Sequence, residues 1–97
     1  MNEIKIKLGS NNKGFIILYE DDIRSGEMVS SVDGSTLTVY HTEVEEKFSG
    51  KGYAKLLLDA LEKYAIENKL KVEALCPYVH AQFKKNPDRF ETIWQKD

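Results

Sequence analysis

The residues with the clearest chemical potential form a short glycine-containing stretch, Ser49-Gly50-Lys51-Gly52-Tyr53-Ala54. Its two glycines let the backbone approach a ligand closely and adopt dihedral angles that a Cβ would forbid. A helix that begins directly after such a loop points unpaired N–H groups at it, and helix N-termini of this kind bind anions. The stretch therefore predicts a phosphate-binding turn. The alternative is an ordinary strand-to-helix turn with Ser49 as the N-cap.

Cys76 and His41 are candidates for a reactive pair. A thiolate is a strong nucleophile, and an imidazole can take the proton from a thiol. Each residue also has an ordinary interpretation, because most free cysteines are small buried hydrophobes and a strand histidine can simply hydrogen-bond within its sheet. His80 is a second candidate base, although its surroundings are typical of a solvated helix surface. The residues alone leave these interpretations open.

Several other functions lack the residues that they need. One cysteine and two histidines without paired spacing do not supply the ligands of a zinc site. A serine hydrolase is unsupported, since the sequence has no Gly-x-Ser-x-Gly elbow. The net charge is −2, and lysines and arginines alternate with acidic residues, which argues against a nucleic-acid-binding surface.

Length and composition indicate one domain over residues 1–97, because domains of about 60 residues already fold alone. The N-terminus has no apolar signal segment, and the lone cysteine agrees with a reducing compartment. The longest aliphatic run, residues 56–58, is far shorter than the roughly 20 residues of a membrane span. We expect a cytoplasmic protein without a membrane partner, and either a monomer or a weak dimer.

The elements that must position the candidate residues begin with an antiparallel meander. Apolar residues alternate with charged ones over residues 3–8, and denser or β-branched runs follow at 14–19, 27–32 and 35–42. Turn residues at 9–12 and 20–22 separate the first three runs, and Asp33-Gly34 is a strong hairpin signal.

The second half of the chain changes period. Apolar residues recur at helical spacing over residues 52–68, and residues 70–76 then alternate as a fifth strand that ends at Cys76. A strand, a helix and a strand across about 30 residues favour a right-handed crossover and a parallel pair. A short helix at 78–85 is broken by Asn86-Pro87, and the apolar tail with Phe90, Ile93 and Trp94 is expected to dock. The predicted fold class is α+β, with a mixed sheet flanked by helices.

The chain resembles the GNAT superfamily of acetyl-CoA-dependent N-acetyltransferases, and within it a group of very small single-domain proteins. The phosphate-loop pattern of the superfamily is matched at Gly52 and Ala54, whereas Ser49 stands where the family has Gln or Arg. The pattern of the small group is matched in order by His41-Thr42, Cys76-Pro77-Tyr78, Phe83 and Asn86-Pro87. The resemblance covers roughly residues 35–90.

The resemblance implies that residues 49–54 cradle the pyrophosphate of acetyl-CoA with their backbone. It also implies that the main chain of Glu43 and Val44 pairs with the pantetheine arm between two diverging strands. Tyr78 would be a wall of that site or a proton donor to the departing thiolate. Lys84, Lys85 and Arg89 are either a solvated face or a contact for the adenosine phosphates.

Within this family, Cys76 would be the nucleophile and His41 the base. The implied activity is transfer of an acetyl group to an amine acceptor, either directly or through an acetyl-Cys76 intermediate. The competing hypothesis is an acyl-CoA-binding module without catalysis, since so short a chain leaves its site open. A third is an interaction domain that keeps the fold and has lost the cofactor.

Overall fold

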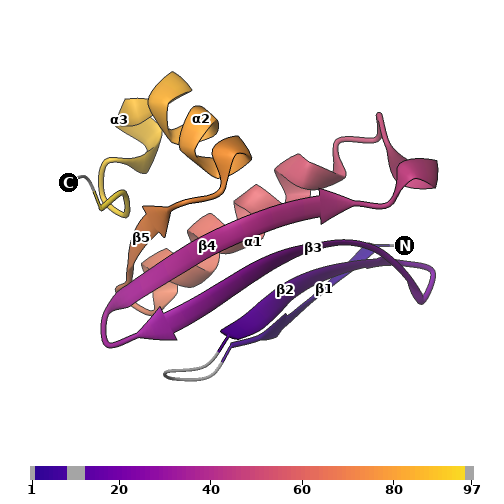
Figure 1. The fold of residues 1–97 in the computed structure, drawn as a ribbon, viewed down its shortest axis with the longest axis horizontal. Helices are drawn as coiled ribbons and strands as arrows, with labels where there is room; N and C mark the ends of the chain where they lie inside the picture. The colour runs from indigo at the N-terminus through magenta and orange to yellow at the C-terminus, as the bar shows by residue number, and fades with distance from the viewer. Residues whose placement is uncertain (1, 9–12, 96–97) are drawn as a thin grey trace.

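The computed structural model describes residues 2–8 and 13–95, which form one sheet with a long helix behind it and two shorter helices beyond one edge (Figure 1). The strands are β1 (Asn2–Lys7), β2 (Lys13–Glu20), β3 (Ile23–Asp33), β4 (Thr36–Val44) and β5 (Lys71–Ala74). They lie side by side in chain order; the first four are antiparallel neighbours, and β4 pairs with β5 in parallel. The predicted mixed sheet is therefore confirmed, while the predicted turn at 9–12 lies outside the described residues.

Turn chemistry explains the two described hairpins. Gly34 has φ +62° in the tight turn between β3 and β4, and Asp21 and Asp22 have φ +50° and +69° between β2 and β3. Asp tolerates the left-handed region better than most residues. The third strand begins earlier than predicted, because the small residues Ser25 and Gly26 are buried strand residues despite their weak strand signal.

Helix α1 (Tyr53–Glu67) covers one face of the sheet and packs on β2, β3 and β4 (Figure 1). Helical spacing predicts an apolar side for this helix. Its members Leu57, Leu58, Leu61 and Ala65 are buried, whereas Ala54 is half-buried. A short 3₁₀ turn, η1 (Glu46–Phe48), precedes it. In the described part of the chain, no helix is both long and apolar enough to cross a membrane.

Two further helices, α2 (Pro77–Lys85) and α3 (Pro87–Phe90), follow β5. The ring of Phe83 stacks on Phe90 with centroids 4.5 Å apart, and Trp94 forms a parallel bridge with Val72 beside β5. Phe90 and Ile93 are buried, so the prediction of a docked tail is confirmed. Burial of each such side chain contributes about 1.5–3 kcal/mol.

The fifth strand is shorter than predicted. It ends at Ala74, and the amides of Leu75 and Cys76 both donate to Val39 O, at 3.1 and 2.9 Å. Pro77 then occupies the first turn of α2, where proline needs no N–H partner. The prediction that Cys76 ends a strand is therefore wrong, because this residue is the N-cap of α2.

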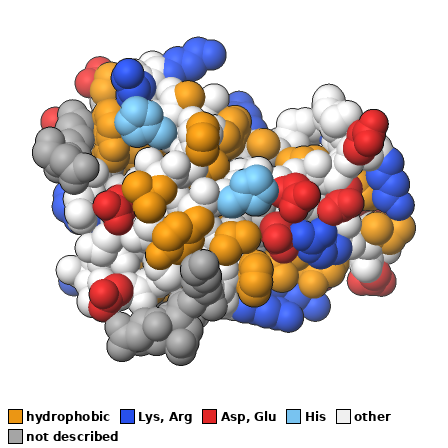
Figure 2. Space-filling model, in the orientation of Figure 1, with side chains coloured by type: hydrophobic (Ala, Val, Ile, Leu, Met, Phe, Trp, Pro, Cys, Tyr) orange, Lys and Arg blue, Asp and Glu red, His pale blue; other side chains and the backbone are white. Residues whose placement is uncertain are grey.

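The sheet has a helical face and an open face. Val29 pairs with His41 but Ser30 pairs with Val39, so Tyr40 is an extra residue, a β-bulge in β4. Paired residues share a face, which places Thr42 with buried Met28 on the helical face and His41 with Val29 on the open face. Figure 2 views the open face, where hydrophobic side chains gather over the sheet and a mixed group of acidic and basic side chains lies toward the right-hand end of the view.

Candidate functional site

The strands β4 and β5 part at Val39. Their parallel register ends with Val39 opposite Ala74. Beyond this point β4 continues to Val44, whereas the segment after β5 turns into α2 (Figure 1). The convergence of two amides on Val39 O marks this end of the pairing. A stretch of β4 thus runs on without β5 beside it.

The backbone of this stretch has a defined orientation. Glu45 N donates to Ser25 O at 2.8 Å, and hydrogen-bonded pairs alternate along an antiparallel ladder. Glu43 and His41 therefore direct their main-chain groups to β3, whereas Thr42 and Val44 direct theirs to the side that β5 has left. An extended ligand could pair with this edge as an additional strand. Of the two residues predicted to make such contacts, Val44 has the suitable orientation and Glu43 faces β3.

The glycine loop has the geometry of an anion site. Gly50 and Gly52 have φ +80° and +75°, and a Cβ at either would meet nothing within 4 Å. Gly52 is the N-cap of α1, without a side-chain cap. Leu56 N donates to Gly52 O, so the amides of Tyr53, Ala54 and Lys55 precede the first intrahelical bond.

The alternative in which Ser49 caps the helix is wrong, because Ser49 closes η1 instead and donates its N–H to Glu46 O at 3.0 Å. The free amides at the start of α1 fit a phosphate group with its negative charge at the positive end of the helix dipole.

The side chains beside the loop are linked to β2. The Tyr53 hydroxyl donates to one carboxylate oxygen of Glu20, and Lys51 Nζ lies 3.8 Å from the other. The Lys51 ammonium also lies 5.4 Å from the centroid of the Phe48 ring, and that ring stacks on Tyr53. Sequence reasoning missed Glu20, because this residue is far along the chain from the loop.

Cys76 contacts Thr42. Its Sγ lies 3.2 Å from Thr42 Oγ1, and the thiol belongs to the hydrophobic core with 2% exposure. A threonine hydroxyl can hold the sulfur in place, but it is no base at neutral pH. Sequence reasoning did not assign Thr42 a role. The signal that could have indicated it is its place in the His41-Thr42 pattern.

His41 is exposed and lies on the opposite face of the sheet from Thr42. Among residues 2–8 and 13–95, its imidazole has no hydrogen bond or ion pair to another side chain. The structure therefore separates the two candidates of the reactive pair: Cys76 contacts Thr42 on the helical face of the sheet, whereas His41 lies on the open face.

Tyr78 lies in the first turn of α2 and is partly buried. Burial, followed by repulsion from Asp59 and Cys76, raises the pKa of its hydroxyl above the ordinary value of 10.0. The phenol is therefore neutral at physiological pH and can donate a proton.

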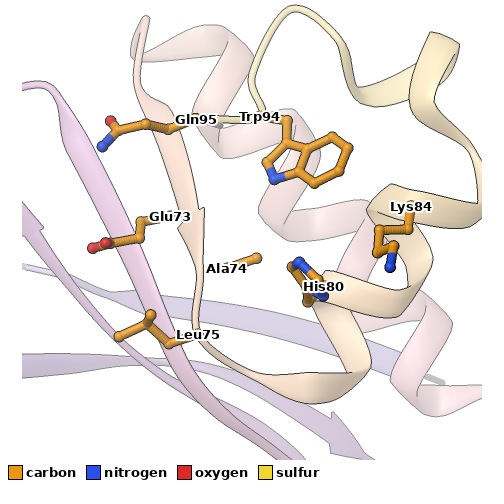
Figure 3. Close-up of a pocket in the computed structure, with 7 residues that line it drawn as sticks. All are labelled: Glu73, Ala74, Leu75, His80, Lys84, Trp94 and Gln95. Carbon is orange, nitrogen blue, oxygen red and sulfur yellow. The ribbon is translucent and has the colours of Figure 1, made fainter. Parts of the chain in front are cut away.

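A separate hollow of about 430 Å³ lies on the other side of β5 (Figure 3). His80 and Lys84 from α2 lie on one side of it and Trp94 of the tail on another, and Ala74 of β5 points toward His80. Arg89 binds Asp59 and Glu62 of α1 instead, at 2.8 and 2.7 Å. Two cations of the predicted basic cluster, Lys84 and Arg89, thus have different surroundings. Within the described ranges, no three His, Cys, Asp or Glu side chains are grouped as metal ligands would be.

Comparison with known proteins identifies relatives of this chain. A family model described as GCN5-related N-acetyl-transferase matches residues 14–93. Proteins named NATD1 from Xenopus tropicalis and Gallus gallus are 29% and 38% identical to the chain over 85 residues. Both alignments cover 88% of this chain, with 69% and 68% of the respective relative.

Solved structures share the fold. The solution structure of a GCN5-like protein from Staphylococcus aureus has a TM-score of 0.66 at 29% identity, covering 96% of this chain and 89% of the other. AAC(6')-Iy in complex with the bisubstrate analogue CoA-S-monomethyl-acetylneamine has a TM-score of 0.54 at 15% identity, covering 89% and 64%. At that identity the likeness shows the fold alone.

Proposed function

Because the chain belongs to the GCN5-related N-acetyltransferase family, we propose that it binds acetyl-CoA and transfers the acetyl group to an amine. The observation that carries this proposal is the combination of two ligand-ready backbone surfaces, the uncapped start of α1 and the edge of β4 beyond Val39. A diphosphate fits the first surface and an extended amide-bearing arm fits the second.

The residues proposed to hold acetyl-CoA are those of the loop and the neighbouring strand. The amides of Gly50, Lys51 and Gly52 and of the first helical residues, Tyr53 and Ala54, would bind the diphosphate, with Ser49 at the start of the loop. The main chain of Val44, adjoining Glu43, would pair with the pantetheine arm. Tyr78 would line the site near Cys76.

We favour direct attack by the amine over a covalent intermediate. Acetyl-CoA would supply a thioester carbonyl as the acetyl donor. His41 would accept the proton of an amine that approaches from the open face, where this imidazole is exposed. Tyr78, whose raised pKa keeps it protonated, would donate to the departing sulfur. Cys76 would shape the site through its contact with Thr42, because a buried thiol beside a neutral hydroxyl has no activating base.

The test starts with calorimetric titration of coenzyme A, followed by assays of thioester loss with and without a panel of amines. Turnover of at least one amine is expected, with rates in Cys76→Ala close to those of the unaltered protein. An acetylated Cys76 trapped in a single turnover would overturn the direct route and support the covalent one. Binding without turnover of any amine would favour a non-catalytic acyl-CoA-binding module, and absence of binding would refute both.

A further inference from the structure

Glu20 is the last residue of β2, and its carboxylate reaches the anion loop. The end of β2 and the loop before α1 lie at the same end of the sheet (Figure 1). The Glu20 side chain is 25% exposed; one oxygen accepts the Tyr53 hydroxyl and the other lies 3.8 Å from Lys51 Nζ. A single carboxylate therefore connects β2 with the loop and with the first residue of α1.

This carboxylate has a position that suits a negative charge. A helix N-terminus stabilises anions, and α1 has no acidic residue in its first turn and no side-chain cap. Glu20, at the end of β2, supplies a negative charge near this helix end. A diphosphate at the loop would place further negative charge near the same cation and the same helix end, so the two anions would oppose each other.

The cation between them is free to change partner. Lys51 is 51% exposed, and at 3.8 Å its ion pair with Glu20 is long and therefore weak. Its other contact is the face of the Phe48 ring, which Lys47 also approaches at 5.3 Å. By contrast, the nearby Arg24 is held by close ion pairs with Glu27 and Glu45, at 2.6 and 2.8 Å.

We propose that Glu20 competes with the diphosphate for Lys51, so that ligand binding transfers the Lys51 ammonium from the carboxylate to the phosphate oxygens. This inference rests on the proposed binding of coenzyme A at the loop. Glu20 then acts as a positioning residue that makes the loop selective, because an anion too weakly charged to attract Lys51 does not displace the carboxylate. The Tyr53 hydroxyl stays with Glu20 and keeps it in place after the exchange.

The test measures dissociation constants of coenzyme A and of pantetheine, which lacks the diphosphate, for four proteins. These are the unaltered chain, Glu20→Gln, Lys51→Met and the double variant. Gln keeps the shape and can still accept the Tyr53 hydrogen bond. Glu20→Gln should bind coenzyme A about two- to fivefold more tightly, the range of an exposed ion pair, with pantetheine unchanged. Lys51→Met should weaken coenzyme A binding, and in its background the gain from Glu20→Gln should shrink.

Two controls separate exchange from other effects. Glu46→Gln removes an exposed charge from η1 and should change the affinity less than Glu20→Gln does. Tyr53→Phe removes the hydrogen bond to Glu20 but leaves the charges of Glu20 and Lys51. Its affinity for coenzyme A therefore measures how far that hydrogen bond alone, as a structural contact, affects binding. Thermal unfolding of every variant checks that it folds. If Glu20→Gln unfolds, Glu20→Asp, which withdraws the carboxylate from Lys51, should show the same direction of change.

Three results would overturn the proposal. The first is weaker or unchanged binding of coenzyme A by Glu20→Gln, and the second is an equal gain for pantetheine. The third is an undiminished gain in the Lys51→Met background, which would mean simple repulsion without exchange of the cation. If the unaltered protein binds neither ligand, the proposed function fails together with this inference, whereas failure of the inference alone leaves coenzyme A binding intact.

Discussion

Gly26→Ala tests whether the edge of β4 is held in place by close packing. Gly26 pairs with Val44, and a Cβ added to it would lie 3.0 Å from Glu43 O, 3.3 Å from Leu57 Cδ1 and 3.4 Å from Val44 Cγ2. The leucine and valine groups can rotate away. Glu43 O belongs to the backbone, so it moves only if β4 moves.

The competing energies decide the sign. Burying a methyl group stabilises by about 0.8 kcal/mol, and replacing a strand glycine by alanine adds about 0.5–1 kcal/mol. Overpacking costs about 1–3 kcal/mol, and a backbone neighbour requires the upper part of that range. We expect a net loss of about 1 kcal/mol, equivalent to a fall of about 4–8 °C in the unfolding midpoint for a domain of this size. Displaced Val44 should also lose the backbone contact proposed for coenzyme A, which would weaken binding about two- to tenfold.

Thermal unfolding and calorimetric titration of coenzyme A measure the two effects. Gly34→Ala is the matched control, because Gly34 has open space around it but a positive φ in the turn between β3 and β4, away from the ligand edge. It should lose a similar stability, about 1 kcal/mol, through backbone strain alone and keep its affinity for coenzyme A. The reasoning is refuted if Gly26→Ala is as stable as the unaltered protein, or if it weakens binding no more than the control.

Three further predictions concern individual contacts. The raised pKa of Tyr78, caused first by burial and then by Asp59 and Cys76, gives a stability that is present below the unfolded value of 10.0 and lost as pH rises through the folded value. Tyr78→Phe should remove that loss in unfolding midpoints measured from about pH 9 to about 11. Arg89→Ala should cost about 1 kcal/mol or less by removing exposed ion pairs to α1, with the difference shrinking at about 1 M salt. Thr42→Val should cost about 0.5–1.5 kcal/mol in urea unfolding, and the cost should fall in a Cys76→Ala background.

Local patterns predicted most of the fold. The helical spacing of Leu57, Leu58 and Leu61 placed α1 within one residue of its observed bounds at each end, and Asp33-Gly34 placed the hairpin. The start of β3 was missed, since Ser25 and Gly26 have weak strand propensity. In the structure Gly26 packs closely against β4 and α1, and Ser25 hydrogen-bonds to Leu18 O and accepts from Glu45 N. Such packing depends on residues that are distant in sequence.

The candidate site was predictable where it depends on backbone geometry. Two glycines before an amphipathic helix predicted the loop. In the structure both glycines have positive φ angles, which lie in the left-handed region. The arrangement of side chains was not predictable, because the bulge at Tyr40 shifts the alternation of β4 by one residue. That shift places Thr42 beside Cys76 and His41 on the other face. Glu20 is brought close to the loop by the pairing of the antiparallel strands, so no pattern in the neighbouring sequence indicates it.

The division of the sheet into a helical and an open face determines at which residues the effect of a substitution on activity can be interpreted. His41 contacts solvent on the open face, so replacing it changes the chemistry of that surface and leaves the core intact. Cys76 is a core residue, so every substitution there also alters packing, and a lost activity has two explanations. Mutagenesis can therefore assign a role to the histidine directly. A loss of activity in Cys76→Ala, by contrast, has to be read together with the single-turnover trapping experiment on the unaltered protein.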